Sequence, residues 1–480
     1  MSVLVIDAGT SGVRAVVVRP DATVAGELYE EVLPDSPASG LVEFDADRYA
    51  DVALSLAARA LDEFGPVRGV GISNQRASTV VWDRQTGRAV APAQGWQDLR
   101  TLGDCLTLGA EGLKLAPNQS ATKITSILAS VDPDRERDLC FGTPDSWLIW
   151  RLTAGAVHAT DLTNAAVTGL ADPATDDWDA SRLERLGIPA AMMPSIVDSS
   201  GVIGEATALE GAPPICGVAG DQQASLIGQG CVRPGLTKVT FGTGGMLNTC
   251  QGADRPQSAT RSRSGTFPIV CWRRGDEVMF GLEAIMLSAG TNVQWLRDDL
   301  GVIATSDESA TVAAECDSTD GVLYVPAQLG LGTPRWDYGA RGALFGLTRG
   351  TTRAQVVRAV LEGVAQRGAD LVDAARAETG MSIDVLRVDG GMSANEVFIQ
   401  AVADATQCRV EVAPMKEATS LGAAFLAGLE LGIWAGWDDV AATWSPSKVI
   451  EPKATVDREA WARAIDRSAG WHSALSTLDF

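Results

Sequence analysis

Residues 3–12 read VLVIDAGTSG, an apolar run that ends in a turn of small and hydroxyl-bearing residues. The run is typical of a buried strand, and the β-branched residues 13–19 (VRAVVVR) favour a second strand that returns as a hairpin. Residues 236–245 (LTKVTFGTGG) repeat this arrangement in the second half of the chain. The repeat predicts two related α/β domains that face each other, each presenting one glycine–threonine loop.

The pattern outside these two stretches predicts the rest of the organisation. Apolar residues at helical spacing favour helices over residues 47–64, 352–378 and 457–469. Residues 67–72 read as a strand, and we expect residues 79–82 to be its hairpin partner. We predict an N-terminal domain over residues 1–230 and a C-terminal domain over residues 231–480, with the last helix free to pack back on the first domain.

Composition narrows the class of protein. The net charge of −22 over 480 residues argues against a nucleic-acid partner, whose phosphates would be repelled. A bound nucleotide would need local help from backbone amides, a metal ion or a few arginines. The start of the chain does not resemble a signal peptide, and no apolar run is long enough to span a membrane, so we predict a cytoplasmic protein without a membrane span. The eight cysteines form no C-x-x-C pair, which favours reduced, buried thiols. A homo-oligomer is left open.

The glycine–threonine turns are candidate phosphate loops, because glycine lets backbone N–H groups approach a phosphate closely. Thr10 and Ser11 would add hydroxyl donors, and Asp7 could hold Mg²⁺ directly or through water. A hairpin turn that needs positive φ explains the first loop alone equally well. The second loop at Gly242–Gly245 favours the interpretation as two phosphate loops.

Two further clusters carry candidate chemistry. In residues 217–224 (GVAGDQQA), Asp221 could accept the proton of a hydroxyl that attacks a phosphate, and Gln222 could bind a neighbouring hydroxyl. In residues 388–395 (VDGGMSAN), the two glycines would let an adenine or ribose lie against the backbone. Helix capping is the alternative in both cases.

In their order and separation these clusters resemble the FGGY carbohydrate kinases, and within that family the glycerol kinases. The resemblance extends over nearly the whole chain and includes the blocks GISNQR (71–76), FGTPDSWLIW (141–150), TDLTNA (160–165), VQWLRD (293–298) and WDYGARGALFGLTRG (336–350). It implies an α/β fold of two related actin/hexokinase-like (ribonuclease H-like) ATPase domains with a cleft between them. The implied activity is ATP-dependent phosphorylation of a small polyol or sugar, with ATP and Mg²⁺ as cofactors.

The resemblance also implies roles for individual residues. It makes Asp221 the general base and assigns Mg²⁺ to Asp7 and Asp221. The positions that it implies for ATP are Thr10, Ser11, Arg14, Thr243, Gly290, Gln294, Gly391 and Asn395. The positions that it implies for the acceptor are Arg76, Trp96, Asp221 and Gln222.

Three positions of the acceptor pocket depart from the glycerol kinase pattern. Ala77 stands where those enzymes have glutamate, Asn118 where they have tyrosine, and Met246 where they have an aromatic residue. The loss of these side chains favours a four- or five-carbon polyol, while glycerol stays a candidate. The segment at residues 209–214 contains no arginine, so we predict no inhibition by fructose 1,6-bisphosphate.

Two alternative functions remain at this stage. One is an FGGY kinase for a ketose or a sugar acid. The other is an ATP-driven conformational or scaffolding protein of the actin-like superfamily. Residues 74–76 together with Asp221 and Gln222 favour a kinase, because a scaffold does not need an acceptor site.

Overall fold

Strand β1 (Ser2–Ala8) lies inside a mixed six-stranded sheet in the computed structural model, which describes residues 2–414 and 417–479. It pairs antiparallel with β2 and parallel with β5, so the predicted N-terminal hairpin is confirmed. The sheet has the order β14-β15-β5-β1-β2-β3. The other strands are β2 (Gly12–Val18), β3 (Val24–Glu31), β5 (Val67–Asn74), β14 (Ser200–Glu205) and β15 (Pro214–Gly220).

The alternation of side chains along β1 divides the core of this domain into two layers. Leu4 and Ile6 pack on one face with α1 (Ala46–Phe64) and α4 (Pro144–Leu152). Val3 and Val5 pack on the other face, with the helices α7 (Asp221–Gly228) and α12 (Ala418–Glu430). Because successive residues of a strand point to opposite faces, a continuous apolar run produces a sheet buried on both sides.

The second domain repeats the plan, as the sequence predicts. Strand β16 is paired antiparallel with β17 and parallel with β22, within the order β18-β19-β17-β16-β22-β23-β24. Its core is formed with α10 (Arg353–Thr379) and α11 (Glu396–Thr406). The strands are β16 (Thr237–Phe241), β17 (Gly245–Gly252), β18 (Phe267–Arg274), β19 (Glu277–Met286), β22 (Val385–Asp389), β23 (Arg409–Val412) and β24 (Lys448–Ile450).

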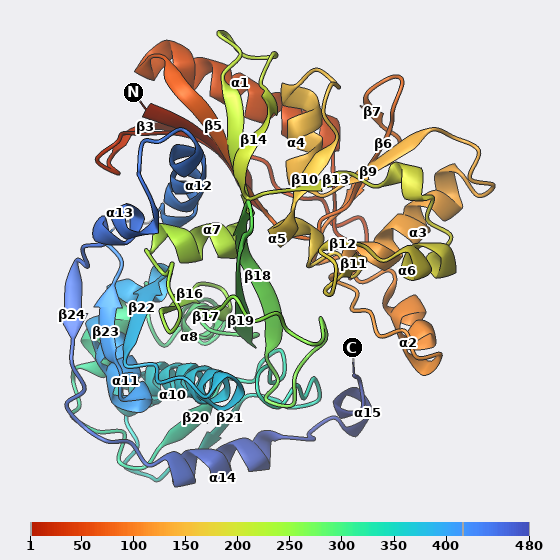
Figure 1. The fold of residues 1–480 in the computed structure, drawn as a ribbon. Helices are drawn as coiled ribbons and strands as arrows, with labels where there is room; N and C mark the ends of the chain where they lie inside the picture. The colour runs from red at the N-terminus through yellow and green to blue at the C-terminus, as the bar shows by residue number, and fades with distance from the viewer. Residues whose placement is uncertain (1, 415–416, 480) are drawn as a thin grey trace.

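Helix α12 comes late in the chain but packs on the first sheet, beside α7 (Figure 1). The two helices approach closely through glycines: a methyl group at Gly422 would lie 1.8 Å from the carbonyl oxygen of Ala224. The helix predicted over residues 457–469, α14 (Arg458–Ser468), instead packs in the second domain, where Trp461 joins a cluster with Val325 and Leu331. The chain therefore returns to the first domain through α12.

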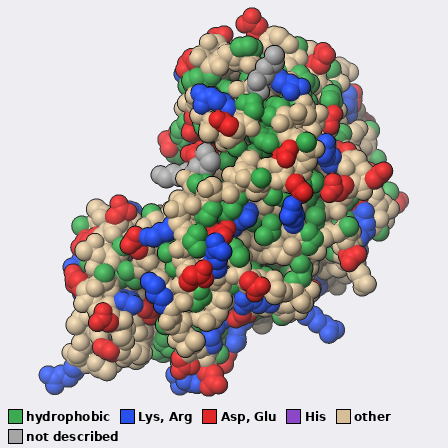
Figure 2. All heavy atoms as spheres, turned by 60° about the vertical axis from the view of Figure 1, so that its left-hand side comes forward, with side chains coloured by type: hydrophobic (Ala, Val, Ile, Leu, Met, Phe, Trp, Pro, Cys, Tyr) green, Lys and Arg blue, Asp and Glu red, His purple; other side chains and the backbone are tan. Residues whose placement is uncertain are grey.

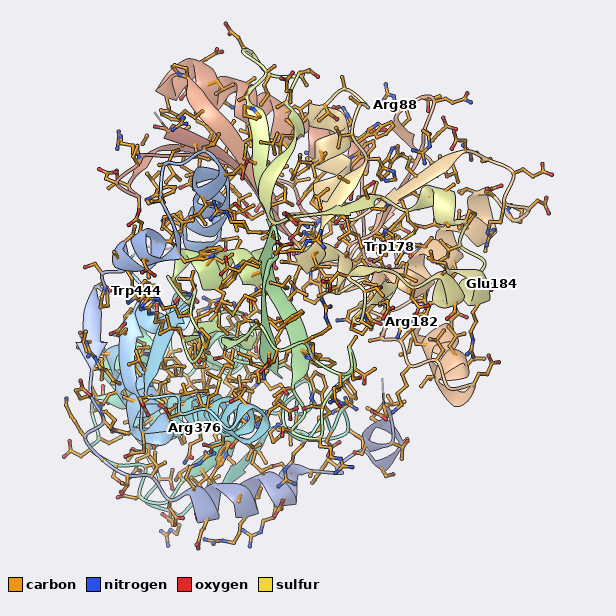
Figure 3. The ribbon with its side chains drawn as sticks, viewed as in Figure 1. Arg88, Trp178, Arg182, Glu184, Arg376 and Trp444 are labelled. Atoms are coloured by element: carbon orange, nitrogen blue, oxygen red, sulfur yellow. The ribbon has the colours of Figure 1, made fainter. Side chains whose placement is uncertain are left out.

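Residues between β5 and β14 form an accessory part of the first domain, at the right of Figure 1. The predicted hairpin between residues 67–72 and 79–82 is wrong. Strand β6 (Val80–Asp83) pairs with β7 (Arg88–Ala89) and β9 (Leu139–Gly142) instead, in a separate small sheet. Trp178 and Arg182, labelled in Figure 3, hold the outer segments together: the Trp178 indole donates to the Pro194 carbonyl oxygen at 2.7 Å, and Arg182 donates to that of Gly169 at 2.9 Å.

The accessory part also contains several short elements. They are β8 (Ala93–Gln94), β10 (Ala159–Asp161), β11 (Ala171–Asp172), β12 (Asp177–Trp178), β13 (Ser195–Val197), α2 (Leu102–Ala110), α3 (Ser120–Val131), α5 (Leu162–Ala165) and α6 (Ala180–Leu186). The second domain adds α8 (Thr291–Asp298), α9 (Glu308–Ala313), β20 (Leu323–Val325), β21 (Ala343–Phe345), α13 (Trp437–Ala442) and α15 (Ser473–Ser476).

The three predicted helices are confirmed as α1, α10 and α14 within a residue or two at each end. All eight cysteines are free, and seven of them are buried, as predicted. None of the helices in the described part of the chain has both the length and the apolar character that a bilayer crossing requires. Acidic and basic side chains are interspersed over the face shown in Figure 2. The cytoplasmic location stays a prediction.

Candidate functional site

Three of the predicted site residues, Asp7, Arg76 and Asp221, meet at one edge of the first sheet. Strands β1, β5 and β15 run parallel and end together, with Asp7 opposite Ser73 and Gly220 opposite Asn74. Because carboxyl ends of parallel strands share an edge, the residues that follow them gather there. Asp7 is the next-to-last residue of β1, and Arg76 lies two residues after the end of β5. Asp221 is the first residue of α7, directly after β15.

Asp7 is held by hydrogen bonds from both sides of the cleft floor. It accepts from the Ser73 hydroxyl at 2.7 Å and from the Ser420 hydroxyl of α12 at 3.4 Å. Burial raises the pKa of Asp7, while the Ser73 hydrogen bond and the charge of Arg14 lower it, and the nearby Asp221 raises it again. Two carboxylates so close together favour a cation between them.

The hydrogen bonds and ion pairs that Asp221 makes with the described residues all involve one of its two carboxylate oxygens. Its Oδ1 accepts the backbone N–H of Gln222 at 2.8 Å and lies 3.5 Å from Nε of Arg76. The side chain is 33% exposed. Desolvation raises the pKa of Asp221, and Arg76 is the main influence that opposes this rise. A carboxylate with a raised pKa is a stronger base than an ordinary aspartate, and Oδ2 is the oxygen that these contacts do not occupy.

Arg76 connects the two domains. Its Nη2 lies 2.9 Å from Oε2 of Glu283 on β19 and 3.6 Å from the sulfur of Met246 on β17. Its Nη1 is buried and has no hydrogen-bond partner among the described residues. An unpaired buried donor is costly, so this atom is suited to bind an oxygen of a ligand.

Two buried charges of the site are absent from the sequence-based predictions. Glu283 receives Arg76 and also accepts from Nδ2 of Asn248 at 3.1 Å. Lys238 donates from Nζ to Oε1 of Gln222 and to the Thr240 hydroxyl, both at 2.9 Å. The signal that could have identified them is a charged residue inside a strand, since such residues are rarely buried without a partner.

The first glycine loop is closed by its own backbone and held from outside. The N–H of Gly9 donates to the Gly12 carbonyl oxygen at 3.0 Å, and the Tyr49 hydroxyl donates to the Gly9 carbonyl oxygen at 2.8 Å. The indole N–H of Trp96 donates to the Thr10 hydroxyl at 3.1 Å. Trp96, predicted for the acceptor, therefore touches the predicted phosphate loop, while the side chain of Ser11 is exposed.

The second glycine loop packs tightly against the start of α8. The N–H groups of Ala289 and Gly290 donate to the carbonyl oxygens of Thr243 and Gly242 at 2.9 and 2.8 Å. A methyl group at Gly290 would lie 2.6 Å from the Gly242 oxygen, so this close contact already requires a glycine. The side chain of Thr243 is exposed.

The residues predicted to bind the nucleoside differ in their contacts and in their exposure. Gly390 has a φ of 92°, and a methyl group there would lie 2.4 Å from the Phe241 oxygen, whereas one on Gly391 would enter open space. Asn395 caps α11 by accepting the Phe398 N–H at 3.0 Å, and its Nδ2 donates to the Ser309 hydroxyl at 3.0 Å. The capping alternative for this residue is thus observed. Gln294 is exposed on α8.

Arg14 lies beside Asp7 on the neighbouring strand, where the two residues are Cα partners. Its Nε is 3.5 Å from Oε1 of Glu27, and its guanidinium lies over the Tyr29 ring at 5.3 Å. Arg14 therefore reaches outward from the loop and influences Asp7 through charge.

The three departing positions of the acceptor pocket lie on separate segments. Ala77 is buried with a φ of 59°, and its carbonyl oxygen accepts the Ser120 hydroxyl at 3.0 Å, which ties it to the turn that carries Asn118. Asn118 is exposed. Met246 contacts the guanidinium of Arg76 with its sulfur.

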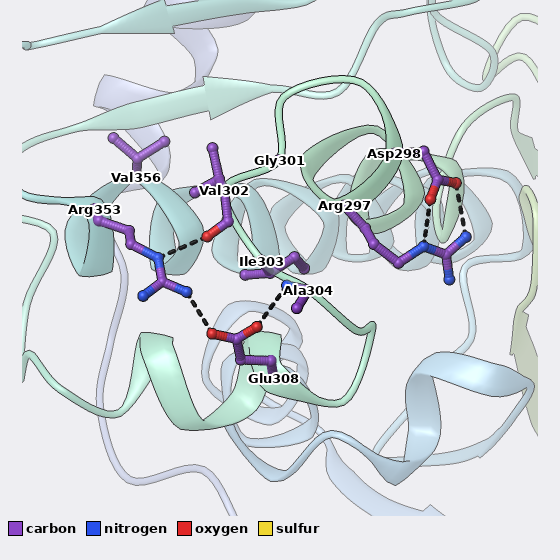
Figure 4. Close-up of a pocket in the computed structure, with 9 residues that line it drawn as sticks. All are labelled: Arg297, Asp298, Gly301, Val302, Ile303, Ala304, Glu308, Arg353 and Val356. Carbon is purple, nitrogen blue, oxygen red and sulfur yellow. Dashed lines mark hydrogen bonds and ion pairs between the residues drawn. The ribbon is translucent and has the colours of Figure 1, made fainter.

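A surface pocket of about 1010 Å³ lies at the other end of α8, away from these residues (Figure 4). Its cations are already neutralised: Arg297 pairs with Asp298 at 2.6 Å, and Arg353 pairs with Glu308 at 2.5 Å. None of the predicted site residues lines it. We therefore do not assign the nucleotide to this pocket.

The donor set fits Mg²⁺ better than a metal that needs a full protein cage. Among the described residues, no group of three or more His, Cys, Asp or Glu could hold a metal ion. Asp7 and Asp221 offer two carboxylates, and Mg²⁺ is usually held by one or two carboxylates together with phosphates and water.

Comparison with known proteins gives a consistent result over the whole chain. Residues 2–228 match the model of the N-terminal domain of the FGGY family of carbohydrate kinases, and residues 237–431 match that of its C-terminal domain. The chain is 40% identical to a glycerol kinase of Rhodopirellula baltica, with 100% of this chain and 93% of the relative covered. It is 42% identical to glycerol kinase 2 of Pseudomonas aeruginosa, over 98% and 97%.

Solved structures agree. The crystal structure of Plasmodium falciparum glycerol kinase with ADP superposes with a TM-score of 0.90 at 29% identity, over 97% of this chain and 98% of that one. A sugar kinase from Brucella ovis, described as a xyloylose kinase, gives a TM-score of 0.85 at 25% identity over the full length of both chains. The predicted two-domain actin/hexokinase-like fold is therefore confirmed.

Proposed function

We propose that this chain, which belongs to the FGGY family of carbohydrate kinases, transfers the γ-phosphoryl group of ATP to a hydroxyl of glycerol or a related short polyol. Relatives named glycerol kinase align with nearly all of it, which supports this class of acceptor. The observation that carries the proposal is the position of Asp221. It is a partly exposed carboxylate beside Arg76, whose guanidinium reaches Met246 next to the second glycine loop.

Asp221 would act as the general base. Its Oδ1 is occupied by the Gln222 N–H and Arg76, so Oδ2 is the atom left to take the proton of the attacking hydroxyl. Desolvation keeps its pKa above that of an ordinary aspartate, which improves proton transfer at neutral pH. Because little covalent chemistry is required of the protein in phosphoryl transfer, positioning and charge carry most of the catalysis.

The nucleotide would lie between the two glycine loops. Thr10, Ser11 and Thr243 present hydroxyls there, and the Thr10 hydroxyl, having accepted the Trp96 N–H, keeps its own hydrogen for a phosphate oxygen. Gly391 leaves open space for the nucleoside next to Asn395, with Gln294 and Gly290 on the facing helix. A related structure that holds ADP supports a nucleotide in this fold.

Asp7 and Asp221 are the residues that would hold Mg²⁺. When bound, the ion offsets negative charge that develops on the phosphates. Ser73 and Ser420 fix the orientation of the Asp7 carboxylate toward the cleft.

A longer polyol is the second candidate acceptor. Ala77 is small, its backbone is held in the left-handed region, and the exposed Asn118 leaves the pocket open on that side. The unpaired Nη1 of Arg76 could bind an additional hydroxyl. These features favour a tetritol or pentitol over glycerol, in contrast to the names of the relatives.

Substitution of the base tests the proposal. We expect Asp221→Asn to fold and to bind ATP, and to lose about 10²–10⁴-fold in kcat, because proton abstraction contributes that much. The measurement is acceptor-dependent ADP release, with Asp299→Asn as a control that changes an exposed carboxylate on α8's far end. Turnover of Asp221→Asn near the wild-type rate would remove Asp221 as the base.

A further inference from the structure

Lys238 is a fully buried lysine that reaches from one domain to the other. It belongs to β16 of the second domain, and its side chain has no exposed surface. Its Nζ donates to Oε1 of Gln222, on α7 of the first domain, and to the hydroxyl of Thr240, each at 2.9 Å. Gln222 immediately follows the proposed base.

Burial of the Lys238 ammonium group carries a desolvation cost. Burial lowers its pKa, while three carboxylates, those of Asp389, Asp221 and Glu283, act in the opposite direction. An apolar side chain of similar length would pack in this strand without the desolvation penalty. A buried lysine at this position is therefore explained better by its hydrogen bonds than by packing.

The chemistry of the two side chains fixes the orientation of the Gln222 carboxamide. A lysine ammonium has only donors, so the amide oxygen must face it. The amide NH₂ group then points away from Lys238, and Nε2 makes no hydrogen bond with a described residue. Because Gln222 is partly exposed, this NH₂ is accessible beside Asp221.

We propose that Lys238 is a positioning residue that holds the Gln222 amide with its N–H groups toward the acceptor, so that the enzyme selects substrates with an oxygen next to the reacting hydroxyl. This inference rests on the proposed function. Arg76 Nη1 is also a donor without a partner among the described residues, so the site offers two donors to the substrate beside the proposed base, Asp221. Without Lys238, the amide could rotate by 180° and present its oxygen instead, so the substrate oxygen would lose its N–H donor and could bind there only by donating its own hydrogen.

The test compares acceptors in Lys238→Met and Lys238→Arg. Glycerol is measured against 1,3-propanediol and 1,2-propanediol, each of which lacks one hydroxyl; if a longer polyol is the better acceptor, its matching deoxy analogues are used. We expect wild type to prefer the full polyol over one deoxy analogue by about 10-fold or more in kcat/KM, since a site built for a hydroxyl leaves donors unpaired without it.

In Lys238→Met we expect this preference to fall to within about threefold, through a higher KM for the full polyol and little change for the deoxy analogue. Lys238→Arg keeps a donor-only group and should retain the preference. Thermal unfolding of each variant identifies any general loss of fold. In the Gln222→Ala background, Lys238→Met should change the preference no further, because the two residues act through one contact.

Different results separate the two claims. An equal loss of kcat/KM for polyol and deoxy analogue, or a preference kept in Lys238→Met, would overturn the role of Lys238 alone. A further loss of preference in the double variant would also contradict it. A wild-type protein that phosphorylates no polyol would overturn the proposed function, and the inference with it.

Discussion

The two sides of the cleft are built in different ways. On the proposed nucleotide side, the loops at Gly9–Gly12 and Gly242–Gly245 are closed by backbone hydrogen bonds, and the side chains of Ser11 and Thr243 are exposed. On the proposed acceptor side, Glu283 and Lys238 are buried and contact the first domain, Glu283 through the partly buried Arg76 and Lys238 through Gln222. We therefore expect a phosphate to be recognised through main-chain shape, and the acceptor through side-chain chemistry. Phosphate recognition should be sensitive to a methyl group added to a glycine, and acceptor recognition to the loss of a single charge.

The largest effect should come from a methyl group at Gly390. Its φ of 92° and the 2.4 Å approach to the Phe241 oxygen leave no room for a side chain. We expect Gly390→Ala to lower the free energy of unfolding by about 2–4 kcal/mol, the range for backbone strain combined with a steric clash. Chemical denaturation measures this change.

Gly391→Ala is the matched control for that variant, because its added methyl group meets open space. It should unfold like wild type and change only the apparent affinity for ATP, by several-fold. Equal destabilisation by both substitutions would contradict the view that the backbone conformation requires glycine at position 390, whereas ligand binding favours it at position 391.

A smaller effect is expected on the acceptor side from Glu283→Gln. The change removes the charge that pairs with Arg76 at 2.9 Å and leaves the guanidinium to move toward Asp221. Breaking a buried pair in this way should raise the KM for the acceptor by about 10- to 100-fold. Steady-state kinetics with the acceptor varied and ATP saturating provide the measurement.

The KM for ATP should change by less than twofold in Glu283→Gln, since Glu283 pairs with Arg76 on the proposed acceptor side of the site. Glu277→Gln, at the exposed start of the same strand, should leave both KM values unaltered. A parallel rise of both KM values in Glu283→Gln would show that the two sides are not separate.

The smallest effect should come from Met246→Phe. A ring beside Arg76 would narrow the pocket, so kcat/KM for a pentitol should fall by about 3- to 10-fold while that for glycerol stays within twofold, as expected for a one-pocket steric change. Met246→Leu conserves volume and should leave the ratio unchanged. Loss of glycerol and pentitol turnover to the same degree would argue against Met246 as a determinant of acceptor size.

The fold could be predicted where it depends on local pattern. The strand–turn repeat at residues 3–12 and 236–245 predicted two related domains, because a buried strand before a glycine turn is encoded in adjacent residues. The pairing of β6 could not be predicted, since its partner β9 is distant in the sequence and replaced the nearer β5. The return of α12 to the first sheet has the same cause: it depends on contacts such as Gly422 against Ala224, which no local pattern shows.

The residues of the candidate site that belong to recognisable sequence motifs could be predicted. The structure brings Asp7, Arg76 and Asp221 together at one sheet edge, as their positions after strands suggested. Lys238 and Glu283 were missed because each is a single charged residue between uncharged neighbours, which forms no motif with a spacing to recognise. Their importance follows only from the partners that the first domain places opposite them, Gln222 and Arg76.

Phosphoryl transfer to a polyol is the central claim, and phosphorus NMR of the wild-type protein with ATP, Mg²⁺ and each polyol tests it most directly. The account predicts a phosphomonoester signal that appears only when a polyol is present and grows in equal amount with ADP. ADP and inorganic phosphate formed at the same rate with and without every polyol and ketose would contradict it, and would instead indicate an ATP-driven conformational protein.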